Sequence, residues 1–224
     1  MPNPRTTMSR HAISGLAGRV HKLVRRYTGS QEGVAAIEFA MIVPILAIMF
    51  IGAVELSQAI TVDRRVTQIA SSTADLVARA EKQISQSEIT DILKVGGYIM
   101  KPYSEAPVQI VIRNVTSSPT NAAVAKQSWS CTYQGTGQTQ TCACSSSSYT
   151  LPGNLVSTND SVVISEVTYS YKPLIFDFFM KKSTGGSGDG SGTYTLTEKI
   201  YLKPRGQAAM LLQANNTPCP SPSF

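Results

Sequence analysis

A run of 21 residues near the N-terminus, Val34–Val54, is apolar except for Glu38. As a helix, at about 1.5 Å per residue, it spans the roughly 30 Å hydrocarbon core of a bilayer. A helix buried in a soluble domain is seldom apolar on every side for about six turns. A cleaved secretory signal has a shorter apolar region, of about 7–15 residues, followed by a small-residue cleavage site. The run therefore predicts a retained transmembrane helix in contact with the lipid bilayer.

The basic charge of the chain lies before this run. The formal net charge is +6. Residues 1–33 hold six basic side chains and one acid, whereas residues 34–224 hold 14 basic and 13 acidic side chains. Because basic segments tend to stay in the cytoplasm, we expect a cytoplasmic leader and a C-terminal part on the other side. Basic side chains are not grouped in that part, so the sequence indicates no nucleic-acid partner.

Both histidines, His11 and His21, also lie in the leader. The rest of the chain therefore lacks the imidazole that catalytic triads, Cys–His pairs and many metal sites require. We expect no enzyme activity, no catalytic residues, no metal, no cofactor and no small-molecule substrate. A membrane-tethered enzyme would have to use carboxylates such as Glu166 and Asp177, whose spacing suggests no site.

Two residues inside the apolar run need a physical explanation. Pro44 removes one helix hydrogen bond and predicts a kink in the transmembrane helix. Glu38 is tolerated if it lies near the headgroups, since an unpaired charge in hydrocarbon is costly. It has a specific partner if the chain is cut between Gly33 and Val34, because the new α-amine and the carboxylate then neutralise each other.

The residues around this bond resemble the start of TadE-like pseudopilins, which belong to the tight-adherence (Flp pilus) assembly systems of bacteria. The similarity lies in a basic leader, Gly33, four residues, then Glu38, Phe39 and Ala40, followed by an apolar helix with Pro44. It extends over about residues 29–65. Classical type IV pilins usually begin the mature chain with an aromatic residue, and Val34 departs from that pattern.

The resemblance implies a minor pilin or pseudopilin with no catalytic role, acting in type IVb pilus assembly, tight adherence and secretion. It implies that a prepilin peptidase cuts after Gly33 and that Glu38 and Phe39 form the processing and assembly motif. The implied partners are that peptidase, other Flp pilins or pseudopilins, and Tad assembly proteins. The implied location is the bacterial inner membrane, single-pass with a periplasmic C-terminal domain, or the pilus itself.

Helical periodicity continues beyond the apolar run to about Glu81. Its apolar stripe packs either on the chain's own domain or on neighbouring subunits. Ser85 and Glu88 match a capping box, which predicts a second helix ending near Gly96-Gly97. The stripe consists of Val62, Val66, Ile69, Thr73, Leu76 and Ala80.

β-Rich segments follow these helices. Val108–Val115, Ser161–Tyr171 and Tyr194–Leu202 predict three strands, and Ser128–Tyr133 predicts a fourth. Helices first and strands later indicate an α+β fold with a small antiparallel sheet. We expect four parts: a leader at 1–33 that is cleaved, a transmembrane helix at 34–60, an extracytoplasmic helical segment at 61–100 and a β-rich domain at 101–224.

The four cysteines all lie in the predicted outer domain, where an even number indicates disulfides. Cys142 and Cys144 are too close in an extended chain to pair easily. We therefore expect Cys131 to pair with one of them and Cys219 with the other. A zinc site is the alternative, but the spacing lacks the paired C-x2-C motifs of such sites.

The segment Ser183–Gly192 is rich in glycine and serine and predicts a flexible connection between the last two strands. Phe176, Phe178 and Phe179 precede it. We expect these side chains to lie in the core; the alternatives are contact with the membrane surface or with a partner. An uncleaved, signal-anchored periplasmic binding or scaffold module is the alternative function for the whole chain.

Overall fold

The computed structural model describes residues 33–80, 82–153, 155–173, 193–206, 210–214 and 217–224. The chain divides into two compact units, Met1–Gly52 and Ala53–Phe224. The first contains the N-terminal part of helix α2, and the second contains the rest of that helix and an α+β domain.

Helix α2 runs without interruption from Val34 to Ala78 and contains Pro44. Within the second unit, its stripe of Val62, Val66, Ile69 and Thr73 is buried in the chain's own domain. The predicted Leu76 is instead 38% exposed, and Val77 takes its place in the core. The helical repeat explains this correction, because the position four residues after Thr73 returns to the same face.

Helix α3, Gln86–Met100, begins at the predicted capping box. The Glu88 amide donates to the Ser85 hydroxyl at 3.2 Å, and the Ser85 amide donates to the Glu88 carboxylate at 2.8 Å. The predicted end at Gly96-Gly97 is wrong, since both glycines are buried inside the helix. A Cβ at Gly96 would lie 2.5 Å from Cδ1 of Ile110, so this glycine allows α3 to approach the sheet closely.

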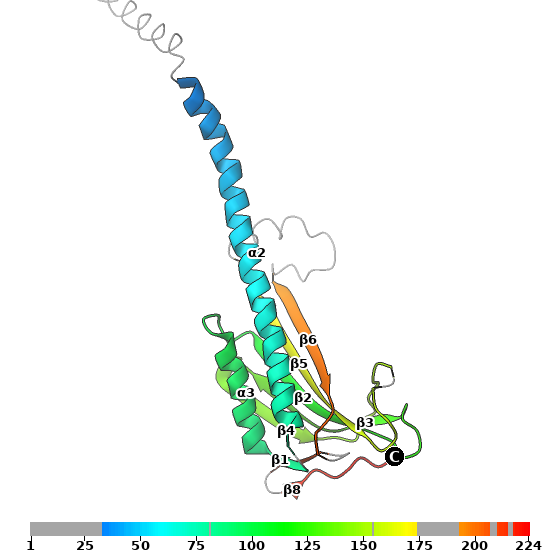
Figure 1. Ribbon diagram of the computed structural model, residues 1–224. Helices are drawn as coiled ribbons and strands as arrows, with labels where there is room; N and C mark the ends of the chain where they lie inside the picture. Colours follow the sequence, from blue (N-terminus) through cyan, green and yellow to red (C-terminus); the bar gives the residue numbers. More distant parts are fainter. Residues whose placement is uncertain (1–32, 81, 154, 174–192, 207–209, 215–216) are drawn as a thin grey trace, which may run out of the picture. The chain divides into compact units, whose positions relative to one another are not determined.

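The main sheet has five antiparallel strands in the order β4-β3-β2-β5-β6 (Figure 1). The four predicted strands are all present, which confirms the α+β fold. A fifth, β4, was not predicted and lies at one edge. The bounds are β2 Val108–Ser117, β3 Ala125–Gln134, β4 Thr139–Cys144, β5 Ser161–Tyr171 and β6 Tyr194–Leu202, with a 3-10 turn, η2, at Thr136–Gln138.

A second, three-stranded sheet was also not predicted. Its strands are β1, Gln83–Ser85, β7, Leu211–Ala214, and β8, Thr217–Pro218, with β1 parallel to β7. The segment Ser183–Gly192 lies in the chain between β5 and β6, the two strands that the sequence predicted it to connect, and the unpredicted β7 and β8 follow β6. Its conformation and the three phenylalanines before it lie outside the described residues.

The largest core of the second unit lies between α2, α3 and one face of the main sheet (Figure 1). Trp129 at its centre is fully buried, and its indole N–H donates to the Met210 carbonyl at 2.9 Å. Asn114 Nδ2 donates to the same carbonyl at 2.7 Å, which holds the segment leading into β7 against the sheet. A smaller core covers part of the other face and contains Val115, Ala125, Val156, Val162 and Ile164.

Candidate functional site

Gly33 and Val34, the predicted cleavage residues, lie at the start of α2. Gly33 forms a single turn before the helix, and Val34 is its first residue, with 52% of its surface exposed. Among the described residues, no atom would lie within 4 Å of a Cβ added at Gly33. Within the part of the chain that the structure describes, the bond between the two residues is therefore not buried by packing.

Glu38 lies four residues after Val34 in the same helix. Side chains at this spacing point to one face and have Cβ atoms about 5–6 Å apart. If the chain began at Val34, its α-amine and the Glu38 carboxylate would lie close enough to form an ion pair, within one helix or between two.

The surface around Glu38 is apolar and exposed. Phe39, next to it, is 67% exposed. An 18-residue window of α2 has a mean hydropathy of 2.6, and none of it is buried. The helix is long and apolar enough to cross a membrane. An apolar surface of this size is unfavourable in water, so it requires lipid or other apolar helices around it.

Pro44 lies inside this apolar part, and the helix continues on both sides of it. Proline has no backbone N–H, so the carbonyl of Ala40, four residues earlier, lacks its usual helical donor. In lipid, such a carbonyl needs a compensating contact. The kink predicted at Pro44 stays a prediction.

The four cysteines form two disulfides, as the sequence predicted. Cys131 on β3 is bonded to Cys142, its directly opposite partner on β4. Cys144, at the end of β4, is bonded to Cys219, which follows β8. The second bond joins the C-terminal tail to an edge of the main sheet. The alternative of a zinc site built from these thiolates is excluded because all four sulfurs are in disulfides.

An ion-pair group lies on the face of the main sheet opposite α2. The Glu166 carboxylate on β5 is 2.6 Å from the Arg113 guanidinium on β2 and 3.3 Å from the Lys199 ammonium on β6. Burial would raise the pKa of Glu166, but the two cations outweigh it and lower the pKa below its usual value. Glu166 therefore links three neighbouring strands as a carboxylate. Asp177, the other carboxylate considered for catalysis, lies outside the described residues.

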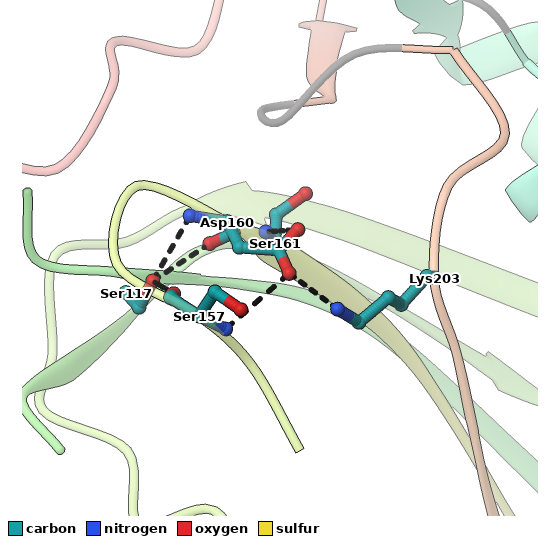
Figure 2. Close-up of polar contacts among 5 residues, drawn as sticks. All are labelled: Ser117, Ser157, Asp160, Ser161 and Lys203. Carbon is teal, nitrogen blue, oxygen red and sulfur yellow. Dashed lines mark hydrogen bonds and ion pairs between the residues drawn. The ribbon is translucent and has the colours of Figure 1, made fainter. Parts of the chain in front are cut away.

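Asp160 organises the turn before β5 (Figure 2). Its carboxylate accepts hydrogen bonds from the Ser161 amide at 2.9 Å and the Ser157 amide at 3.4 Å, and from the Lys203 ammonium at 2.6 Å. Its main-chain amide donates to the Ser117 hydroxyl at 3.0 Å. Burial opposes the charged form, but these donors outweigh it and lower the pKa of Asp160. The contacts hold the end of β2, the start of β5 and the segment after β6 together.

The sequence patterns did not show that Glu166 and Asp160 hold neighbouring strands together. Glu166 carries no local signal, because its partners come from strands distant in the sequence. Asp160 does have a local sequence signal, because a Ser-Thr-Asn-Asp run before a β-rich segment is typical of turns stabilised by Asx side chains. Within the described ranges, no group of three His, Cys, Asp or Glu residues has the geometry to hold a metal ion.

Comparison with known proteins identifies the helical part. Residues 33–75 match a family model described as TadE-like protein. The match begins at Gly33 and covers most of α2, whereas the sheets lie outside it. No curated protein and no solved structure matches the chain. The resemblance drawn from the motif is thereby confirmed for this segment.

Proposed function

We propose that this chain, with its TadE-like segment at residues 33–75, is a minor pilin or pseudopilin that is cut by a prepilin peptidase. The TadE-like match supports involvement in Tad (Flp) pilus assembly. The observation that carries the finer proposal is the geometry at the start of α2. There, Gly33 precedes the helix, Val34 is its first residue, and Glu38 lies one turn after Val34.

In the first step of the proposed mechanism, the basic leader directs insertion of the apolar helix with residues 1–33 in the cytoplasm. A peptidase then cuts the Gly33–Val34 bond. The cut removes six basic side chains and one acid, and it creates a positively charged amine at Val34. Loss of the leader lowers the electrostatic repulsion between neighbouring helices, because like charges close together are unfavourable.

Glu38 acts in the second step. Its carboxylate pairs with the Val34 amine of the same chain or of a neighbour, which makes both charges acceptable in an apolar environment. Phe39 and the other exposed apolar side chains of α2 then pack against other Flp pilins or pseudopilins. The role is one of assembly, with no catalytic step assigned to this chain.

The proposed location is the inner membrane, with the second unit in the periplasm and with contacts to Tad assembly proteins. The two disulfides support this orientation, because disulfides form and persist in the oxidising periplasm and are rare in the cytosol. The basic leader supports it independently.

The test is intact mass and N-terminal sequencing of the membrane-extracted chain from strains with and without prepilin peptidase. We expect a start at Val34 only where the peptidase is present. Gly33→Leu should abolish the cut, and Gly29→Ala, which changes another leader glycine, should leave it intact. A chain that keeps its leader in both strains would contradict the proposal and favour an uncleaved, membrane-anchored module.

A further inference from the structure

The apolar run and the folded domain meet without a linker. Val54, the last residue of the run, is 41% exposed, whereas Glu55, the next residue, is only 7% exposed and buried in the second unit. Burial in the second unit therefore begins on one face of α2 directly after the run, while Leu56 on another face is 62% exposed. Any group that packs around Glu55 lies close to the end of the apolar run.

Tyrosines surround this point. Tyr171, the last residue of β5, is only 9% exposed and belongs to the main core, against which Ala59 of α2 and Tyr103 pack. Burial raises the pKa of its phenol, and the charge of the Glu55 carboxylate adds to the rise. Tyr103 lies close to Tyr171 and contributes to the same shift. Tyr194, the first residue of β6, is directly opposite Tyr171 in the strand pairing and is 42% exposed. Three tyrosines thus gather at this end of the domain.

Basic side chains lie beside the tyrosines. Arg65 donates to the carbonyls of Ile99 and Lys101 at 2.5 and 2.6 Å, and its guanidinium carbon is 5.6 Å from the centre of the Tyr103 ring. These contacts attach the C-terminal end of α3 and the residue after it to α2. Lys101, two residues before Tyr103, is exposed, and its ammonium lies 4.8 Å from the centre of the Tyr98 ring.

Tyrosine and lysine are suited to the membrane–water interface. The tyrosine ring enters the apolar boundary while its hydroxyl stays hydrated, and lysine extends its ammonium toward phosphate. We propose that Lys101, Tyr103 and Tyr194 form a juxtamembrane edge that rests on the lipid headgroups of the bilayer crossed by α2. This inference rests on the proposed membrane anchorage, and it adds a lipid-contact surface to the folded domain.

The opposite end of the sheet offers a matched control. Phe224 is 48% exposed, and the centre of its ring lies 5.6 Å from the ammonium of Lys126 at the start of β3. Lys126 pairs with Thr116 near one end of β2. Val108, at the other end of β2, pairs with Tyr169 of β5. At about 3.3 Å per residue, the two ends of β2 are roughly 25 Å apart. A nitroxide in a single headgroup layer quenches only on contact, so it cannot quench indoles at both ends.

The test uses the full chain in vesicles that contain lipid with a headgroup nitroxide. Tyr194→Trp and Phe224→Trp each add one exposed indole, and the signal of buried Trp129 is subtracted using the parent chain. We expect quenching several-fold stronger for Tyr194→Trp. Adding anionic lipid should increase that quenching, and Lys101→Gln should reduce the increase. Near-UV circular dichroism verifies that each variant is folded.

Equal quenching at the two positions would overturn the inference. So would a Tyr194→Trp indole that neither the lipid nitroxide nor aqueous iodide quenches, because a protein partner would then cover it. Flotation of the vesicles shows whether the lipid-contact edge alone is wrong or the membrane anchorage is wrong as well. A chain that floats without preferential quenching contradicts only the lipid-contact edge, whereas a chain that does not float contradicts the membrane anchorage and the edge together.

Discussion

The hydroxyl of Thr73 on α2 lies 2.8 Å from the hydroxyl of Ser165 on β5, and both residues are fully buried. Thr73 also donates to the Ile69 carbonyl one turn earlier, at 2.7 Å. A hydroxyl has one hydrogen, so Ser165 is the donor between the two side chains. This polar contact inside an apolar core favours one rotation of α2 against the sheet, because a rotation that separates the two hydroxyls leaves Ser165 without its acceptor.

Replacing Thr73 with valine should therefore destabilise the second unit. The change keeps the shape of the side chain but leaves the Ser165 hydroxyl without its acceptor, which costs about 1–3 kcal/mol. Urea unfolding followed by Trp129 fluorescence would measure the loss. Thr67→Val is the matched control, because Thr67 is exposed on the same helix and bonds back to Asp63 in the same way. Equal losses in both variants would contradict the role of the buried pair.

Gly135→Ala should be more damaging than a small substitution usually is. The backbone of Gly135 is in the ordinary helical region, with φ of −61°, but an added Cβ would overlap the Glu105 carbonyl oxygen. Its amide also donates to the Val108 carbonyl at 2.8 Å, so the chain cannot easily move away. We expect a loss of about 1–3 kcal/mol or more in unfolding free energy.

Gly153→Asn provides the comparison for Gly135→Ala. Gly153 has a φ of +61°, which asparagine tolerates better than most residues, and no described atom would lie within 4 Å of a Cβ added there. The unfolding midpoint of this variant in urea should stay close to that of the parent chain. A larger loss at Gly153 than at Gly135 would refute the steric explanation.

The two disulfides should contribute unequally to stability. The Cys144–Cys219 bond joins residues 75 apart, and the Cys131–Cys142 bond joins residues 11 apart. The chain-entropy relation gives about 4 kcal/mol for the longer loop and about 3 kcal/mol for the shorter. Paired Cys→Ala variants, compared by urea unfolding, should rank in that order. The reverse order would show that local packing around Cys131 outweighs loop entropy.

Acid should weaken the second unit through Asp160 and Glu166. Both have pKa values lowered in the folded state from ordinary values of 3.8 and 4.5, so the folded protein binds protons less readily than the unfolded chain. Their stabilisation is present above those ordinary values and is lost as pH falls through the lower folded pKa values. Unfolding free energy, measured between pH 2 and 7, should therefore decline below about pH 4.

Lys203→Gln isolates the part due to Asp160. Removing the ammonium 2.6 Å from the carboxylate should bring the pKa of Asp160 closer to its ordinary value and make the decline below that pH shallower. Lys94→Gln is the control, because Lys94 pairs with Asp91 at 3.7 Å on the exposed surface of α3. An unchanged acid profile in Lys203→Gln would rule out the Asp160 pair as its source.

Glu38→Gln should separate membrane insertion from later steps. The amide keeps nearly the same size but cannot neutralise the Val34 amine, so an unpaired buried charge would cost several kcal/mol in a helix assembly. We expect normal insertion, measured by membrane fractionation, with impaired processing or pilus formation. Asp63→Asn, which changes an exposed acid farther along α2, should leave both intact. Normal processing and piliation in Glu38→Gln would remove the proposed role.

Local patterns in the sequence were sufficient for several elements. The apolar run predicts α2, Ser85 and Glu88 predict the start of α3, and alternating or β-branched residues predict β2, β5 and β6. Each depends on residues a few positions apart, so no knowledge of the fold is needed. The motif at Gly33, Glu38 and Phe39 has the same property, and the TadE-like match begins at that glycine.

Other features depended on contacts between distant parts of the chain. β4 lacks the buried alternation of a core strand and is held by pairing with β3 and by disulfides. β7 is only four residues long and pairs with β1, 128 positions earlier at Gln83↔Leu211. Gly96 and Gly97 look like a helix end in the sequence, but tertiary packing makes them interior positions, with Gly96 next to Ile110 of β2 and Gly97 next to Tyr133 of β3.

The membrane-capable helix, the motif at its start and the α+β class can therefore be predicted from residues close together along the chain. The order of the strands, the partners of the four cysteines and the ion pairs of Glu166 and Asp160 become known only from the folded chain. These depend on which distant segments meet, and many pairings satisfy the same local pattern until one shared core selects among them.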